Sequence, residues 1–177
     1  FIFLLLFSNL IFLVMKIYEA TKNEFVISTD KNKLDIQFIQ NYLSTESYWA
    51  KNIPVETVKK SIDGSCCFGL YVNESTSAIT QTLPAGSQVG FARVVTDYAT
   101  FGYLADVFVI EKFRGKGLAK WLMEEIMNHA DLQGLRRWML ATKDAHGLYI
   151  KFGFLPLDKP ERIMGFKPFE EYPQTNS

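Results

Sequence analysis

The most informative part of the sequence is the segment Asp106-Val-Phe-Val-Ile-Glu-Lys-Phe-Arg114-Gly-Lys-Gly-Leu-Ala119. Its pattern indicates a strand, a turn with two glycines and the start of an amphipathic helix. Amides at a helix start lack partners, and the helix dipole favours negative charge there. Gly115 and Gly117 let the main chain approach an anion, and Arg114 and Lys116 add positive charge. The turn therefore predicts a diphosphate site; the alternative is a plain tight connection, and the spacing fits neither a P-loop nor a dinucleotide fingerprint.

The sequence around this segment predicts a single α+β domain over residues 16–177. It has short apolar runs with turn residues between them, and amphipathic stretches after Asn32, Pro54 and Gly117. Strands are expected at 24–29, 67–72, 89–96, 101–110, 138–142 and 162–166, and helices at 32–43, 54–63, 118–130 and 145–152. This order predicts a mixed, mostly antiparallel twisted sheet of about six to seven strands, flanked by about four helices.

Composition narrows the function classes. The chain has 177 residues, with 19 basic and 19 acidic side chains, so no basic excess points to nucleic acid. The two cysteines, Cys66 and Cys67, are adjacent and cannot build a disulfide framework. No cysteine and histidine spacing indicates zinc, so no metal is expected. A reducing, cytoplasmic location fits these features best.

Residues 1–15 differ from the rest of the chain because they are almost entirely apolar, and the first charge is Lys16. The stretch is shorter than a bilayer span and lacks the basic region of a signal peptide. We expect that it is not part of the fold and that Met15 is the true start. The alternatives are a membrane anchor and an extra hydrophobic helix; unless it is an anchor, no membrane partner is expected.

Two motifs, which follow one another along the sequence, resemble motifs of a known family. Arg114-Gly-Lys-Gly-Leu-Ala119 is similar to the Gln/Arg-x-x-Gly-x-Gly/Ala motif of the GNAT superfamily of acyl-CoA N-acyltransferases. Ala145-x-x-Leu-Tyr-x-x-Phe-Gly-Phe154 resembles the superfamily's short helix and the Gly-Phe that follows it. The resemblance covers about residues 16–166. It implies a sheet that splays between its fourth and fifth strands.

The resemblance also implies acetyl-CoA, or another short acyl-CoA, as the cofactor. Main-chain groups of Phe108, Val109 and Ile110 would pair with the pantetheine arm. A threonine stands at Thr142, where the family often has an asparagine that contacts the arm, which weakens this one assignment. The implied diphosphate contacts are Arg114, Gly115, Lys116, Gly117, Leu118 and Ala119.

Three residues are candidates for proton transfer in direct acetyl transfer to an amine. Tyr149 matches the family's general acid for the leaving thiolate; the alternative is a core aromatic residue. Asp106, placed by strict alternation on one face with Leu104 and Phe108, is either the base or a structural partner of Arg93. His146 is either a proton relay or an ordinary hydrogen-bonded side chain.

The acceptor pocket is expected to contain Tyr48, Trp49, Arg93 and Asp97; the alternative for the aromatic pair is a place in the core. The predicted acceptor is a primary amine of a small molecule or a protein, in a ternary complex with acetyl-CoA. The alternative function is a non-catalytic acyl-CoA-binding regulatory module of the same fold. A monomer or a homodimer is expected.

Overall fold

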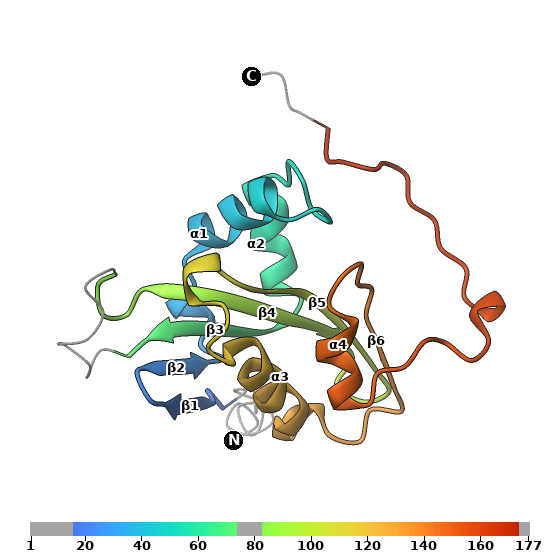
Figure 1. The fold of residues 1–177 in the computed structure, drawn as a ribbon. Helices are drawn as coiled ribbons and strands as arrows, with labels where there is room; N and C mark the ends of the chain where they lie inside the picture. Colours follow the sequence, from blue (N-terminus) through green and yellow to red (C-terminus); the bar gives the residue numbers. More distant parts are fainter. Residues whose placement is uncertain (1–15, 74–82, 174–177) are drawn as a thin grey trace, which may run out of the picture.

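The structure is a computed structural model that describes residues 16–73 and 83–173. The apolar extension 1–15 lies outside these residues. One six-stranded sheet runs through the described chain, with its strands in sequence order (Figure 1). Adjacent strands among the first five are antiparallel to each other, and the sixth strand is parallel to the fifth. The strands are β1 (Glu19–Lys22), β2 (Phe25–Ser28), β3 (Cys66–Val72), β4 (Gln88–Thr96), β5 (Phe101–Val109) and β6 (Arg137–Met139).

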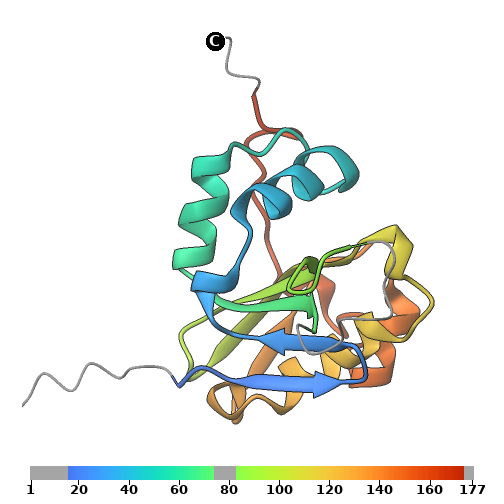
Figure 2. The ribbon, with the colours of Figure 1, turned by 90° about the vertical axis from the view of Figure 1, so that its left-hand side faces the viewer.

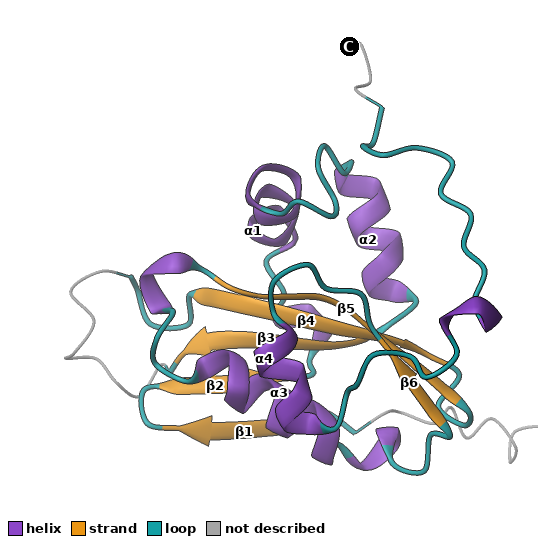
Figure 3. Ribbon diagram, turned by 45° about the vertical axis from the view of Figure 1, so that its right-hand side comes forward, coloured by secondary structure: helices purple, strands orange, loops and turns teal. Residues whose placement is uncertain are grey.

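Four α-helices cover the two faces of this sheet. The pair α1 and α2 lies on one face, while α3 and α4 lie on the other (Figures 2 and 3). This mixed, three-layered arrangement confirms the predicted fold class. The α-helices are α1 (Ile36–Asn41), α2 (Val55–Asp63), α3 (Leu118–Asn128) and α4 (His146–Tyr149). Shorter helical turns are η1 (Lys31–Lys33), η2 (Tyr42–Glu46, a π-helix), η3 (Glu111–Phe113), η4 (Ala130–Leu132), η5 (Ile150–Phe152) and η6 (Pro160–Arg162).

Local capping explains where the first two helices begin and end. The carboxylate of Asp35, and not Asn32 as predicted, accepts the Phe38 amide at 2.9 Å and starts α1. Pro54 precedes α2, where its fixed φ suits a helix start, and Gly64 ends that helix. The loop between the two helices carries residues 47–54 over the edge of the sheet, and this loop becomes part of the site.

Two apolar clusters lie on opposite sides of the sheet. The α1–α2 cluster joins these helices to Phe91 and Phe108 of the central strands. The α3–α4 cluster joins Leu104, Val109 and Tyr149 to the buried face of α3. That helix face comprises Leu118, Trp121, Leu122, Met123 and Ile126. The central strands are therefore covered on both sides and form a rigid support for the site.

The sheet opens between β5 and β6. Their parallel pairing covers only Phe101–Tyr103 against Arg137–Met139, although β5 continues to Val109. Beyond Tyr103, β6 has ended and the chain turns away from β5 (Figure 3). This confirms the predicted separation of the fourth and fifth expected strands, which are β5 and β6. The second half of β5 thus keeps an edge that no strand of the described residues covers.

A β-bulge interrupts the alternation of β5. Phe91 pairs with Phe108 and Arg93 with Ala105, so β5 has one residue more than β4 in this interval. Asp106 occupies the bulge in the left-handed region, with φ of 53°. Leu104 consequently belongs to the α3–α4 cluster and Phe108 to the α1–α2 cluster. The prediction that both residues share one face with Asp106 was wrong, because the extra residue shifts the two-residue period.

The strand predicted at 162–166 is also wrong. Arg162 ends the turn η6, and the following residues are extended but have no neighbouring strand. Met164 is 96% exposed and Phe166 is 92% exposed, with Gly165 between them. A strand of this composition forms only against a partner edge, and the segment stands away from the sheet (Figure 1). Among the described residues, no helix has the length and apolarity needed to cross a membrane, and no group of three metal-ligating side chains comes together.

Candidate active site

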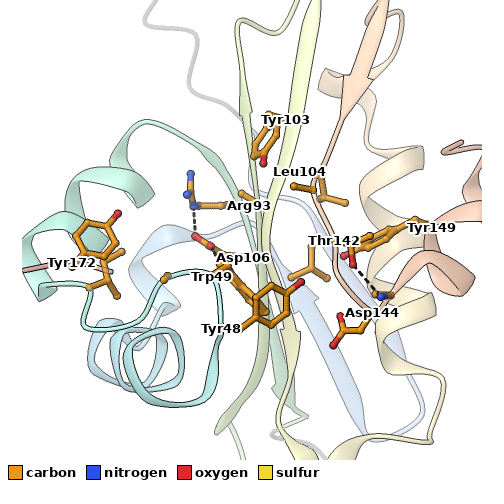
Figure 4. A pocket seen from close by; sticks show the side chains of 16 residues that line it. Tyr48, Trp49, Arg93, Tyr103, Leu104, Asp106, Thr142, Asp144, Tyr149 and Tyr172 are labelled. Carbon is orange, nitrogen blue, oxygen red and sulfur yellow. Dashed lines mark hydrogen bonds and ion pairs between the residues drawn. The ribbon is translucent and has the colours of Figure 1, made fainter. Parts of the chain in front are cut away.

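A cavity of about 300 Å³ lies where β5 and β6 separate. It is bounded by the α1–α2 loop, the bulged part of β5 and the start of α4 (Figure 4). Six of the predicted site residues meet here, although they come from four separate parts of the sequence. They are Tyr48, Trp49, Arg93, Asp106, Thr142 and Tyr149.

Asp106 is held on both sides by neighbours in this cavity. Its Oδ2 accepts a hydrogen bond from Arg93 Nε at 2.6 Å, and its Oδ1 accepts one from Trp49 Nε1 at 3.0 Å. The Arg93 guanidinium also donates to Ser65 Oγ at 3.3 Å. The side chains of this ion pair are 18% and 8% exposed, for Arg93 and Asp106 respectively. The structure thus contains the pairing with Arg93 that was the alternative to a base; it uses Oδ2, while Oδ1 accepts the Trp49 indole N–H.

Tyr48 crosses from the α1–α2 loop to the loop before α4. Its hydroxyl oxygen accepts the main-chain amide of Lys143 at 2.8 Å, and its ring meets Trp49 edge-on at 5.0 Å. The ammonium of Lys143 lies 5.7 Å from the centre of the Tyr48 ring. This bridge fixes two loops that are 95 residues apart in the sequence, so the cavity has a wall over the opening of the sheet.

Tyr149 enters the cavity from α4. Only 9% of the residue is exposed, and its ring packs edge-on against Phe154 at 6.1 Å. Burial, with smaller electrostatic contributions from Tyr48 and Asp144, raises the pKa of Tyr149 to about 12. The phenol is therefore protonated at neutral pH and can donate a proton or a hydrogen bond into the cavity.

Thr142 sets the start of α4. Its Oγ1 accepts the Ala145 amide at 3.0 Å (Figure 4), which closes the turn before the helix. The hydroxyl retains its own proton for one further hydrogen bond. The threonine at this position therefore stabilises the turn before α4 with its hydroxyl oxygen. It lines the cavity with one donor where an asparagine would offer an amide pair.

The glycine turn lies beyond the far end of β5. Gly115 and Gly117 have φ of 77° and 76°, which favours glycine, and Gly117 is the residue before α3. A Cβ at either position would meet nothing within 4 Å. Gly117 has no side chain to cap the first amides of α3, so these amides and the helix dipole face an open space. The turn has the backbone features of an anion site, and its binding of a diphosphate stays a prediction.

The two basic side chains of the turn are already engaged. Arg114 donates to the carbonyl of Val109 at 3.1 Å and to the Tyr42 hydroxyl at 3.0 Å. The ammonium of Lys116 lies 5.3 Å from the centre of the Phe113 ring. Arg114 therefore fastens the turn to η2 and β5, and the main-chain amides are the principal anion-binding groups that remain.

The second half of β5 connects the cavity to this turn. The Ile110 amide donates to the Val89 carbonyl of β4 at 3.0 Å, so it is committed to that neighbouring strand. By alternation, the amide of Val109 faces the opposite side, where β6 is absent. Phe108 is buried and stacks on Tyr42 with ring centres 3.8 Å apart. Of the three residues expected along a cofactor arm, Val109 has its amide on the open edge.

Two of the residues predicted for catalysis or acceptor binding lie outside the cavity. Asp97 binds its own turn: its carboxylate accepts the amides of Ala99, Thr100 and Phe101 and the Thr100 hydroxyl. These hydrogen bonds, led by that of the Thr100 side chain, hold the pKa of Asp97 well below its usual range. His146 is exposed and lines a separate hollow of about 340 Å³ beside Trp138 and Phe154.

Comparison with known proteins identifies the family to which this chain belongs. A model of the Acetyltransferase (GNAT) family matches residues 36–154, which include the glycine turn, α4 and every residue that lines the cavity except Tyr172. The chain belongs to the GNAT family. It is 35% identical to a Gibberella zeae protein with a provisional acetyltransferase name, over 74% of this chain and 78% of that protein.

Solved structures of GNAT proteins share this fold. A Xanthomonas campestris protein, described provisionally as a GNAT-family acetyltransferase, is 47% identical with a TM-score of 0.74, over 83% of this chain and 95% of that one. An acetyltransferase of Clostridium acetobutylicum, assigned from its sequence and solved with acetyl-CoA, is 14% identical with a TM-score of 0.55. That match covers 86% of this chain and 95% of the other, and it shows the likeness of fold alone.

The structure adds three cavity residues to the sequence-based site of this GNAT protein. Asp144 lies in the loop before α4, Tyr103 on β5 and Tyr172 in the C-terminal segment (Figure 4). Asp144 is adjacent to the second motif, so its position next to Ala145 was a usable signal. Tyr172 is brought in by a main-chain bond from its amide to the Lys51 carbonyl at 3.2 Å, which no motif indicates.

Proposed function

We propose that this GNAT protein is an N-acetyltransferase that moves an acetyl group from acetyl-CoA to a primary amine in a ternary complex. One observation carries the proposal: the phenol of Tyr149 is protonated, nearly buried and placed in the cavity where β5 and β6 separate. A leaving thiolate needs a proton or a hydrogen bond, and this phenol is the cavity group suited to supply it.

The donor fits the chain at two places. The amides following Gly115 and Gly117 suit a diphosphate, since a helix start with open space favours an anion. The uncovered edge of β5 suits an extended arm, with the Val109 amide as one donor to it. Acetyl-CoA would supply the activated acetyl group as a thioester. The Clostridium acetobutylicum neighbour was solved with acetyl-CoA, which supports this choice of donor.

The cavity residues divide into a proton donor and positioning residues. Tyr149 holds its proton at Oη and would give it to the departing thiolate, while the proton lost by the attacking amine would pass to solvent, from which the phenol is restored. A main-chain amide of β5 near Val109 stabilises negative charge on the acetyl oxygen. We assign Asp106 a positioning role, because its charge is paired with the Arg93 guanidinium and its other oxygen accepts the Trp49 indole N–H.

The remaining features define the protein around this reaction. We propose that residues 16–177 form one acetyltransferase domain, since the cavity draws on residues from Tyr48 to Tyr172. A cytoplasmic location fits Cys66 and Cys67, which are free and buried. Burial raises the pKa of the Cys67 thiol to about 12, so it stays protonated and unreactive at neutral pH.

Thermal unfolding of the full chain with acetyl-CoA, CoA or ATP tests the proposal. A ligand at 100 times its dissociation constant stabilises the fold by about 2.7 kcal/mol, which is a shift of several degrees for a chain of this size. We expect a shift with acetyl-CoA but not with ATP, followed by CoA release when a primary amine is added. If acetyl-CoA binds but no added amine causes the release of CoA, the protein is a binding module instead. No shift at saturating acetyl-CoA would overturn the proposal.

A further inference from the structure

Five of the 16 residues that line the cavity are aromatic (Figure 4). Tyr48 and Trp49 form one side, with exposed fractions of 51% and 41%, and their rings meet edge-on. Tyr103, Tyr149 and Tyr172 come from β5, α4 and the C-terminal segment to complete the walls (Figure 4). Five rings in one small cavity favour a ligand with a flat or apolar body, and their faces attract a cation.

The charged groups of the cavity leave one carboxylate unmatched. Only Arg93, Asp106 and Asp144 carry charge among the lining residues, and the first two neutralise each other at 2.6 Å. Asp144 is exposed to the cavity mouth and makes no hydrogen bond or ion pair with a described residue. The nearby ammonium of Lys143 lies over the Tyr48 ring and is not part of the lining. The lining therefore carries a net charge of about −1 and attracts a cation.

The cavity also limits the size of its ligand. Its volume of about 300 Å³ is at the lower end of the range for small-molecule sites. The hydrogen bond from the Lys143 amide to Tyr48 closes one side, and Tyr172 is held beside the loop by its bond to Lys51. A small molecule fits these boundaries better than the surface of a folded protein.

We propose that the acceptor is a small primary amine with a flat, apolar body, that its ammonium is received by Asp144, and that it has no carboxylate next to the amine. This inference rests on the proposed function, because it names the substrate class of the same cavity. A carboxylate beside the amine would face Asp144 across the cavity mouth, and two like charges in one small site repel.

Equilibrium binding to the full chain tests the inference without catalysis. The probes are 2-phenylethylamine, 2-phenylethanol, which lacks the ammonium, and L-phenylalanine, which adds the carboxylate. Calorimetric titration should show 2-phenylethylamine binding about 10-fold more tightly than either analogue, a difference of about 1.4 kcal/mol, because only this probe brings an ammonium to Asp144 without a carboxylate beside it. Equal or tighter binding of L-phenylalanine, or no binding of 2-phenylethylamine, would overturn it.

Two variants assign the effect to Asp144. We expect Asp144→Asn to weaken binding of 2-phenylethylamine about 10-fold and to leave 2-phenylethanol unchanged. Asp158→Asn removes another exposed carboxylate outside the cavity and should change neither affinity. Unchanged 2-phenylethylamine binding by Asp144→Asn would refute the role of Asp144. Melting curves of both variants confirm that they fold.

A parallel assay separates failure of this inference from failure of the proposed function. Each protein is titrated with acetyl-CoA, and CoA release is measured with 2-phenylethylamine, L-phenylalanine and butane-1,4-diamine. If acetyl-CoA stabilises the protein and CoA is released only when L-phenylalanine is the amine, the acetyltransferase proposal stands and the proposed substrate class is rejected. Absence of both stabilisation and CoA release would reject the proposed function, whatever the amine titrations show.

Discussion

The glycine turn and the cavity lie near the same end of β5 but are built from different parts of the chain. The turn presents main-chain amides of consecutive residues, 115–119, on a fixed helix start. The cavity collects side chains from the α1–α2 loop, β4, β5, the α4 region and the C-terminal segment. A site made of main chain depends on local backbone angles, whereas a site made of side chains depends on how distant segments pack. The two should therefore respond differently to substitution.

The largest expected effect is at the turn. We expect Gly117→Glu to abolish stabilisation by acetyl-CoA, because a side chain and a negative charge would occupy the open space before α3. Gly134→Glu is a matched control, since Gly134 has the same φ of 76° and the same open space. Each variant should lose about 1 kcal/mol of unfolding free energy from strain. Thermal unfolding with and without acetyl-CoA measures both effects, and a retained shift in Gly117→Glu would contradict the assigned site.

A substitution in the cavity should instead change the free energy of unfolding. Asp106→Asn leaves Arg93 without its carboxylate in a site where the two side chains are 18% and 8% exposed. We expect a loss of about 3 kcal/mol in the free energy of unfolding, measured by urea denaturation. Glu56→Gln removes the exposed pair with Lys59 and should change stability by less than about 0.5 kcal/mol. Unchanged stability with a collapse in kcat would instead make Asp106 the base.

Tyr149 tests the chemistry of the cavity. We expect Tyr149→Phe to lower kcat roughly 100-fold, about 2.7 kcal/mol, because the proton donor is removed while the ring still packs on Phe154. Acetyl-CoA binding should persist, since the turn is untouched. Tyr98→Phe, in the β4–β5 turn, is the control and should retain kcat. A rate for Tyr149→Phe within a few-fold of the parent would remove the assigned acid.

The pH dependence gives the smallest expected effect. With its pKa at about 12, Tyr149 remains protonated far above neutrality, so kcat should show no alkaline decline from this group up to about pH 10. An ordinary tyrosine would be half ionised there. Stability has its own dependence: tyrosines of the unfolded chain ionise near pH 10, so the folded state is favoured less between about pH 10 and 12. Short assays on folded protein separate the two, and an inflection of kcat near pH 8 would contradict the assignment.

The sequence predicted the features that are local. The glycine turn, the helix after it and the short helix with Tyr149 all lie in contiguous motifs, and Gly115 and Gly117 have the left-handed angles that the turn requires. The general order of strands and helices followed from apolar periodicity in the same way. The early hairpin strand β1 was missed, because Glu19–Lys22 is mostly exposed and polar.

The side-chain site could be predicted only in part. Tyr48, Trp49 and Arg93 were found by their place in the layout, but Tyr172 reaches the cavity through a long segment that no pattern connects to it. Asp97 lies outside the cavity, and its carboxylate accepts four hydrogen bonds within its own turn. Asp144 went unnoticed although it adjoins a motif. Such assignments require tertiary structure, since the deciding partners are distant in sequence.

The bulge at Asp106 has a consequence for substitution among related chains. A φ of 53° is tolerated by glycine, asparagine and aspartate but strains β-branched residues. Valine or isoleucine at this position would favour a regular strand without the bulge. The residues after position 106 would then point to the opposite face of the sheet. Phe108 would then leave Tyr42 for the opposite layer. Relatives that keep this fold should therefore vary here mainly among aspartate, asparagine and glycine, whatever acceptor they use.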